Sequence, residues 1–287
     1  MNGKTNKVGL TGTLVKLFAA AALVLGAVAS QQAVAGIANT KHNLGSAGTG
    51  TNHATNGTEE ICVFCHTPHG SNTAVAAPLW NKALPGTTYN VYNSNAATAT
   101  TTIDGAIVPV GSVSLACLSC HDGTQAMDNM INAAGSGWGV GGGAGASQGY
   151  TWAGSNKITG VANLTNGSNG DLTNDHPIGI EYCGGSSTTT YTGGSTGTCG
   201  DKDFKDATKH ATKNLWWVDT TGGTANREKT DMILYTRTEA TNGNTAKPYV
   251  ECASCHDPHV EAKDTNQVAF LRVSQASSGV CLSCHTK

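Results

Sequence analysis

Apolar residues are sparse along most of this chain and gather in one N-terminal run. That run, LFAAAALVLGAVA at residues 17–29, follows Lys4, Lys7 and Lys16 and is too short to span a bilayer well. The small residues AVAG at 33–36 then provide an A-x-A site. We predict a secretory signal over residues 1–35, cleaved after Ala35, with an uncleaved anchor helix as the alternative. The mature protein would have no membrane span and would lie in an oxidising compartment.

From Gly36 onward the chain is poor in residues that build a core. Leu, Ile, Val and Phe number 37 among these 252 residues (287 minus 35), which is about 15%. The most helix-like stretch is DFKDATKHATKNLWW at 203–217, and residues 101–114 are typical of a short hairpin or loop. Such a chain folds only if another component supplies apolar mass or crosslinks.

Two low-complexity insertions interrupt the second half of the chain. Residues 135–149 contain eight glycines in fifteen positions, which is typical of a flexible surface loop. Residues 184–198 are Gly, Ser and Thr except for Tyr191, and Cys183 and Cys199 bracket them. In an exported protein these two cysteines are expected to form a disulfide, with two reduced thiols as the alternative.

The charge balance excludes one class of partner. Seventeen Lys and Arg residues stand against 19 Asp and Glu residues, giving a net charge of -2, and charged residues make up only 13% of the chain. Nucleic-acid binding requires a basic face, so we expect no nucleic-acid partner.

One five-residue pattern, C-x-x-C-H, occurs four times. The cysteines are Cys62, Cys65, Cys117, Cys120, Cys252, Cys255, Cys281 and Cys284, and the histidines are His66, His121, His256 and His285. This is the attachment pattern of c-type heme: in one helical turn both thiols and the imidazole share a face. Zinc held by four thiolates is the alternative, but zinc does not need a histidine after each second cysteine. A thioredoxin-like dithiol needs one motif rather than four. We predict four covalent heme c groups.

Four hemes would also supply the missing core. The predicted fold class is mostly irregular or loop structure with short α-helices and little β structure, cored by the hemes. The motif segments are expected to be short helices, with Thr58, Ser114 and Ser278 as candidate N-caps. The longest gap between motifs separates the second from the third. A single domain over 36–287 would thus hold hemes 1 and 2 in 36–134 and hemes 3 and 4 in 250–287.

Six further histidines are available for the second axial position of the irons. Methionine is scarce in the mature chain, so bis-histidine ligation is favoured over His/Met ligation. Distal candidates are His42, His69, His176 and His259, followed by the lower-ranked His210 and His53. Irons closed on both sides carry electrons rather than bind small molecules.

His69 and His259 each follow a motif histidine by three residues, with a proline directly before them. Their Cα atoms lie within about 11 Å of the motif histidine, so reaching the far face of the same porphyrin is difficult. We expect each to ligate a different iron, which would hold two hemes close together. A surface histidine in a proline turn is the alternative for both.

The sequence resembles the multiheme c-type cytochromes of metal-reducing bacteria, and more narrowly the tetraheme outer-surface cytochromes that form extracellular nanowires. The resemblance rests on residues 41–70, CLSCHDGT at 117–124, NDHPIGI at 174–180 and CASCHDPH at 252–259. It implies bis-histidine hemes stacked through a homopolymeric filament, in which a histidine of one subunit ligates a heme of the next. His42, seven residues into the mature chain, is the expected cross-subunit ligand, and a monomer whose His42 folds back onto its own heme is the alternative.

The resulting hypothesis is an electron-transfer protein, not an enzyme, that is secreted to the extracellular space or outer cell surface. Its partners would be other copies of itself, other multiheme cytochromes and an extracellular electron acceptor. The alternatives are a soluble periplasmic tetraheme shuttle, a multiheme reductase with one open iron, and a structural zinc protein.

Overall fold

The computed structural model describes residues 36–92, 103–135, 147–165, 170–185, 199–222, 226–240, 245–260 and 269–287. The chain divides into two units, Met1–Gly36 and Ile37–Lys287, and only Gly36 of the first is described. The expected signal segment and residues 136–146 and 186–198 of the two insertions lie outside the described residues. Within the described part, no helix is long and apolar enough to cross a membrane.

The helices are short, and each C-x-x-C-H motif forms part of one. They are η2 (Cys62–Phe64), α2 (Ser114–His121), α3 (Cys252–Cys255) and α4 (Gly279–Leu282). In three motifs the amide of the histidine donates to the carbonyl of the first cysteine, at 2.8 to 3.2 Å, so the turn is closed across the whole motif. The remaining 3-10 helices are η1 (Gly36–Asn39), η3 (Gly160–Ala162), η4 (Tyr182–Gly184) and η6 (Ala276–Ser278).

The predicted N-caps behave differently from expectation. Thr58 Oγ1 accepts the amide of Glu60 rather than capping η2. Ser278 is the residue before α4 but makes no side-chain cap. Ser114 is the first residue of α2, and its hydroxyl is bonded across the molecule to the carboxylate of Glu251. In place of the local amide that an N-cap accepts, the Ser114 oxygen accepts the distant amide of Cys252.

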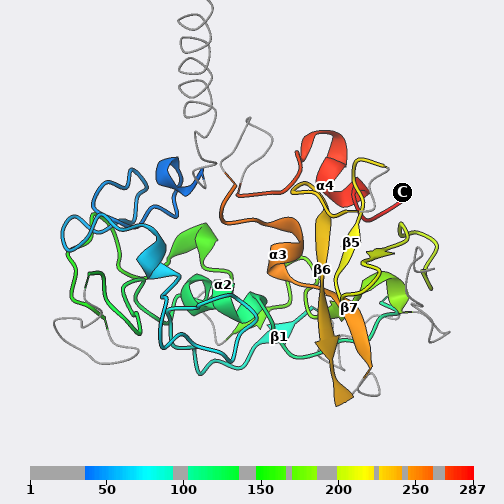
Figure 1. Ribbon diagram of the computed structural model, residues 1–287, viewed down its shortest axis with the longest axis horizontal. Coiled ribbons are helices and arrows are strands. Elements are labelled where there is room, and N and C mark those ends of the chain that lie inside the picture. Colours follow the sequence, from blue (N-terminus) through cyan, green and yellow to red (C-terminus); the bar gives the residue numbers. More distant parts are fainter. Residues whose placement is uncertain are drawn as a thin grey trace, which may run out of the picture. The chain divides into compact units, whose positions relative to one another are not determined.

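A five-stranded antiparallel sheet adds β structure that the sequence analysis did not predict. The strands, in the order β3-β7-β6-β5-β4, are β3 (Ile180–Glu181), β4 (Thr208–Lys209), β5 (Trp216–Val218), β6 (Met232–Thr238) and β7 (Ala246–Val250). Figure 1 shows β5, β6 and β7 side by side, with α3 following directly from β7. Strands β1 (Asn90–Val91) and β2 (Asp171–Leu172) form a separate parallel pair.

The predicted helix over 203–217 is wrong. This segment instead supplies β4 and the start of β5, in which Trp216 pairs with Lys209 and Leu234. Trp216, Trp217 and Val218 are all at least 98% buried. Successive side chains of a strand point to opposite faces of the sheet, so three consecutive buried residues mean that both faces of the sheet are covered at β5. Packing has therefore overridden the helix propensity of the polar residues before them.

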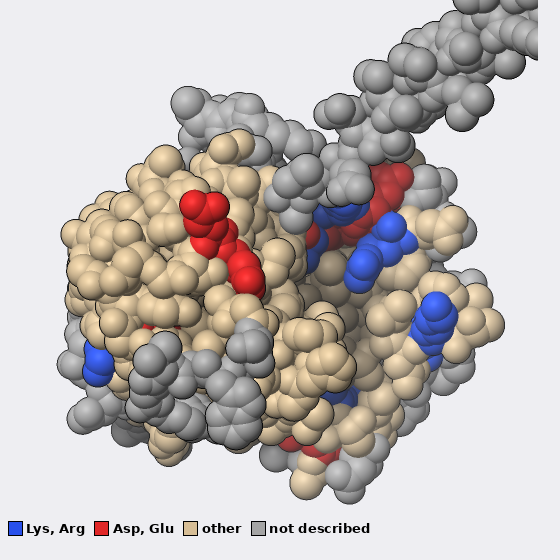
Figure 2. Space-filling model, turned by 60° about the vertical axis from the view of Figure 1, so that its left-hand side comes forward, with Lys and Arg blue, Asp and Glu red and all other residues tan. Residues whose placement is uncertain are grey.

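Within the part of the chain that the structure describes, buried apolar residues form four small clusters rather than one core. Phe64, Met127 and Met130 belong to a cluster against Cys65 and Cys120. The sheet supplies the largest cluster, and Cys255 and Cys284 pack against it. The clusters therefore support motif cysteines. Figure 2 shows few charged side chains, scattered over a mostly uncharged face.

Cys183 and Cys199 are joined in a disulfide whose Cα atoms are 5.3 Å apart. Both residues are 98% buried in the cluster formed by the sheet. The bond links positions with a sequence separation of 16, beside the cysteines of the third and fourth motifs.

Replacing both cysteines by serine is expected to lower the free energy of unfolding by about 3 kcal/mol, because the unfolded chain regains the entropy of the open loop. Chemical denaturation of the mature protein measures this difference. Non-reducing peptide mapping provides the control. A free thiol at either position in the wild-type protein would contradict the pairing.

Candidate heme sites

Three of the four motif histidines have one ring nitrogen fixed by a backbone carbonyl. His66 Nδ1 lies 2.7 Å from Pro78 O, His121 Nδ1 lies 2.8 Å from Ala162 O, and His256 Nδ1 lies 2.6 Å from Ala269 O. A carbonyl oxygen only accepts, so Nδ1 must carry the proton. The lone pair of each neutral ring is then on Nε2, which is the arrangement that a metal-ligating imidazole requires.

Two of these motif histidines lie opposite a second histidine. The ring centres of His66 and His259 are 6.1 Å apart with an interplanar angle of 16°, and those of His121 and His42 are 6.1 Å apart with an angle of 64°. An imidazole nitrogen lies about 2 Å from a bound metal and about 1 Å from its own ring centre, so rings sharing one iron are roughly 6 Å apart. Both pairs therefore fit the two axial positions of one heme iron. With hemes bound, this geometry would let His259 hold the iron of heme 1 together with His66, and His42 the iron of heme 2 together with His121.

The ring of His42 faces His121 of its own chain. Two expectations were open for His42, a heme of a neighbouring subunit and a heme of its own chain, and this geometry is compatible with the second. The ring of His42 also stacks on Phe270, with centres 4.2 Å apart and planes 9° apart. Burial, followed by repulsion from His121, lowers the pKa of His42 to about 4. The ring thus stays neutral, as a ligand must be.

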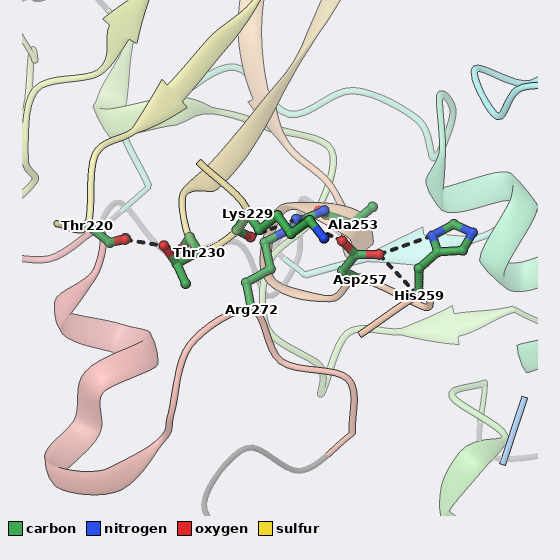
Figure 3. Close-up of polar contacts among 7 residues, drawn as sticks. All are labelled: Thr220, Lys229, Thr230, Ala253, Asp257, His259 and Arg272. Atoms are coloured by element: carbon green, nitrogen blue, oxygen red, sulfur yellow. Dashed lines mark hydrogen bonds and ion pairs between the residues drawn. The ribbon is translucent and has the colours of Figure 1, made fainter. Parts of the chain in front are cut away.

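His259 is oriented by a chain of polar contacts shown in Figure 3. Its Nδ1 is 3.2 Å from Asp257 Oδ1, and Arg272 Nη1 donates to the other oxygen of Asp257 at 3.3 Å. Arg272 Nε also donates to Ala253 O at 3.2 Å. The hydrogen bond from His259, supported by the charge of Arg272, lowers the pKa of Asp257 to about 2. An ionised Asp257 accepts a hydrogen bond from Nδ1–H of His259, which would leave Nε2 available to the iron of heme 1.

His176 lies in a pocket beside the third and fourth motifs. The pocket lining includes His176, Cys255, Cys281, Cys284 and His285. His176 Nδ1 is 3.1 Å from Pro177 O, so its Nε2 is also available. Burial lowers the pKa of His176, and His285 and then His256 add smaller repulsions. The structure therefore brings His176 to the third and fourth motifs.

The three other histidines have no ring contact with another histidine in the described part of the chain. His53 Nδ1 is 2.7 Å from Gly50 O, which leaves Nε2 free. His69 is exposed, and its backbone carbonyl accepts hydrogen bonds from Thr67 Oγ1 and Asn132 Nδ2. His210 Nδ1 accepts the amide of Thr212 at 3.2 Å, so the neutral ring carries its proton on Nε2. That protonation state does not suit ligation through Nε2, which places His210 last among the candidates.

The cysteines show how the four motifs follow one another. Cys65 lies near Cys120, the thiols of Cys117 and Cys252 are hydrogen-bonded, and Cys255 lies near Cys281 and Cys284. The bond between Cys117 and Cys252 raises the pKa of the first thiol and lowers that of the second. In the protein with heme attached, these sulfurs would be thioethers rather than thiols. The motifs thus form a series in chain order, with the second and third in direct contact.

Sequence reasoning missed the residues that orient the ligands. Asp257 and Arg272 fix His259, and the carbonyls of Pro78, Ala162 and Ala269 fix the motif histidines. Only Asp257 had a local signal, because it stands between His256 and His259. The carbonyl acceptors come from segments 12 to 41 residues away, which no motif spacing reveals.

Comparison with known proteins bears on the C-terminal part of the chain. A protein family described as a doubled CXXCH motif matches residues 247–287, which contain the third and fourth motifs. No curated protein shows a significant match to the sequence. A doubled CXXCH motif binds covalent heme c, and two such sites in one short segment support a multiheme c-type cytochrome whose role is electron transfer.

Proposed function

We propose that this protein is an exported tetraheme c-type cytochrome that carries electrons through bis-histidine hemes as the subunit of an extracellular conductive filament. The electron-transfer role is supported by two histidine pairs whose ring centres are 6.1 Å apart: His66 with His259, and His121 with His42. Each couple would close both axial positions of an iron. A closed iron exchanges electrons without binding a substrate.

The chain's own residues would perform three tasks. Each motif's cysteines would bind a porphyrin through thioethers, and its histidine would bind the iron, which when present supplies the ferric–ferrous couple. Distal imidazoles such as His259 would exclude water and other ligands from the iron. The cysteine contacts from Cys65 to Cys284 would keep neighbouring hemes close, so that electrons pass along the series 1-2-3-4.

Export and assembly rest on the sequence. The N-terminal segment has the features of a secretory signal, and the resemblance to nanowire-forming cytochromes supports a filament. The low charge content is compatible with close packing of copies. A soluble periplasmic shuttle is the second candidate, because an N-terminal His42 that ligates within its own chain needs no neighbour.

Mass spectrometry of denatured protein from a host that matures c-type cytochromes is expected to show four attached porphyrins. The reduced protein in its assembled form should bind no carbon monoxide, because all its irons are then expected to be six-coordinate. Three or fewer hemes would contradict the tetraheme assignment. A colourless protein that contains zinc would contradict the assignment as a cytochrome. Carbon monoxide bound to one wild-type heme would favour the reductase.

A further inference from the structure

A buried carboxylate lies at the junction between the second and third motifs. Glu251 is 99% buried and directly precedes α3. Ser114, the first residue of α2, donates its hydroxyl to Glu251 Oε2 at 2.5 Å, and Arg237 Nη1 lies 3.1 Å from Oε1. The same hydroxyl of Ser114 accepts the amide of Cys252 at 2.9 Å. The carboxylate therefore connects the helix of heme 2 to the helix of heme 3.

The cation beside this carboxylate is shared with a second carboxylate. Arg237, on β6, also bonds Glu239 through Nε at 2.8 Å and Nη2 at 2.6 Å, so one guanidinium serves two carboxylates. The ring of Tyr249 on β7 lies beside the guanidinium at 5.8 Å. Lys247, the charged residue of β7, is paired with Glu181 at 2.8 Å. From α2, the hydroxyl of Ser114 reaches the carboxylate of Glu251, and Cys117 lies one turn further along the same helix.

Burial raises the pKa of Glu251 to about 7, while Ser114 and Arg237 act in the opposite direction and Glu239 adds repulsion. The folded protein therefore binds a proton at Glu251 below about pH 7 and releases it above. A negative charge in an interior of low dielectric constant interacts strongly with any charge change nearby. Hemes 2 and 3 would be attached close to this carboxylate. Cys252 of the third motif directly follows Glu251, and its thiol is hydrogen-bonded to that of Cys117 of the second motif. Reduction of these two hemes is therefore the charge change that Glu251 would feel.

We propose that Glu251 is a proton-binding site coupled to the reduction of hemes 2 and 3. This inference rests on the proposed function. One electron from an external reductant converts a ferric iron to a ferrous iron, and one proton from water converts the Glu251 carboxylate to the neutral acid. No bond other than the O–H bond forms. Glu239, whose side chain is 27% exposed, provides contact between this buried group and solvent.

The sign of the effect follows from the charges. A neutral Glu251 does not oppose an added electron, whereas an ionised Glu251 does. The equilibrium constant for reduction of the coupled hemes should therefore fall as pH rises through about 7. The limit is tenfold per pH unit for one proton per electron, equivalent to about 59 mV.

The experiment is a spectroelectrochemical titration of the four-heme protein between about pH 5 and pH 9. The wild-type protein should show hemes whose reduction becomes less favourable over this range. Glu251→Gln should remove that dependence and keep the reduction equilibrium at its acidic value. Glu59→Gln, at an exposed position shortly before Cys62, is the matched control and should behave as wild type.

Two further measurements keep the test decisive. The reduced-minus-oxidised infrared spectrum should contain a protonated-carboxyl band that is absent in Glu251→Gln. Glu239→Gln should move the pH range of the effect downward, because it removes a charge that raises the pKa of Glu251 and competes for Arg237. If Glu251→Gln does not fold, the Glu239→Gln variant decides the question. An unchanged pH dependence in these variants would overturn the inference and assign the proton to the heme propionates. Fewer than four hemes in the wild-type protein would instead overturn the proposed function.

Discussion

Replacing His259 by alanine is expected to open the iron of heme 1 while all four hemes remain attached. The ring of His259 lies 6.1 Å from that of His66, and the attachment cysteines, Cys62 and Cys65, are on a different segment. The reduced variant should therefore bind one carbon monoxide per chain, about a quarter of the hemes, and show the same fraction of high-spin iron. His42→Ala should have the corresponding effect at heme 2 through His121.

The matched control is His210→Ala. His210 accepts a hydrogen bond at Nδ1 and has no ring contact with a motif histidine within the described residues, so all irons should stay low-spin. Asp257→Asn gives a graded version of the experiment, because weakening an orienting bond typically costs about 10-fold to 100-fold in ligand affinity. Acid should then detach His259 at a pH about one to two units higher than in the wild-type protein. A fully low-spin His259→Ala protein would contradict the pairing with His66.

The local half of each heme site was predictable, and the distal half was not. The C-x-x-C-H spacing requires only one helical turn, and the structure has such a turn at each motif. The distal ligands depend on contacts across the chain. His259 follows the third motif but faces His66 of the first, and His42 precedes the first motif but faces His121 of the second. The spacing of His259 indicated that it would avoid the iron of its own motif, and gave no information about which other iron would receive it.

The sheet shows the same limit on a larger scale. The run Trp216-Trp217-Val218 has no alternation of apolar and polar residues that would indicate a strand. It forms a strand because β4 and β6 pair with its two edges. Ser114 had the local features of an N-cap, yet its hydroxyl is used 137 residues away by Glu251. In both cases a partner distant in sequence decides the outcome, and a single sequence contains no signal for such a partner.

The histidines left over by these pairings lead to the second large prediction. Four bis-histidine irons, as proposed, would need four distal ligands. Among the described residues, His259, His42 and His176 lie beside motif histidines, so one of the irons of hemes 3 and 4 would still need a ligand. His69 follows His66 through Thr-Pro as His259 follows His256 through Asp-Pro. His259 faces a histidine of another motif, and His69 is exposed without such a partner among the described residues.

We therefore expect His69, rather than His42, to ligate a heme of a neighbouring copy in the proposed filament. Such a contact joins two different surfaces, so it propagates instead of closing. Electron microscopy of wild-type protein should show filaments, and His69→Ala should abolish them and open one iron per chain. His42→Ala should open heme 2 but retain filaments, and His53→Ala tests the other histidine whose Nε2 is available. Filaments that persist in His69→Ala with all irons low-spin would contradict this assignment, and wild-type protein that stays monomeric at high concentration would favour the periplasmic shuttle.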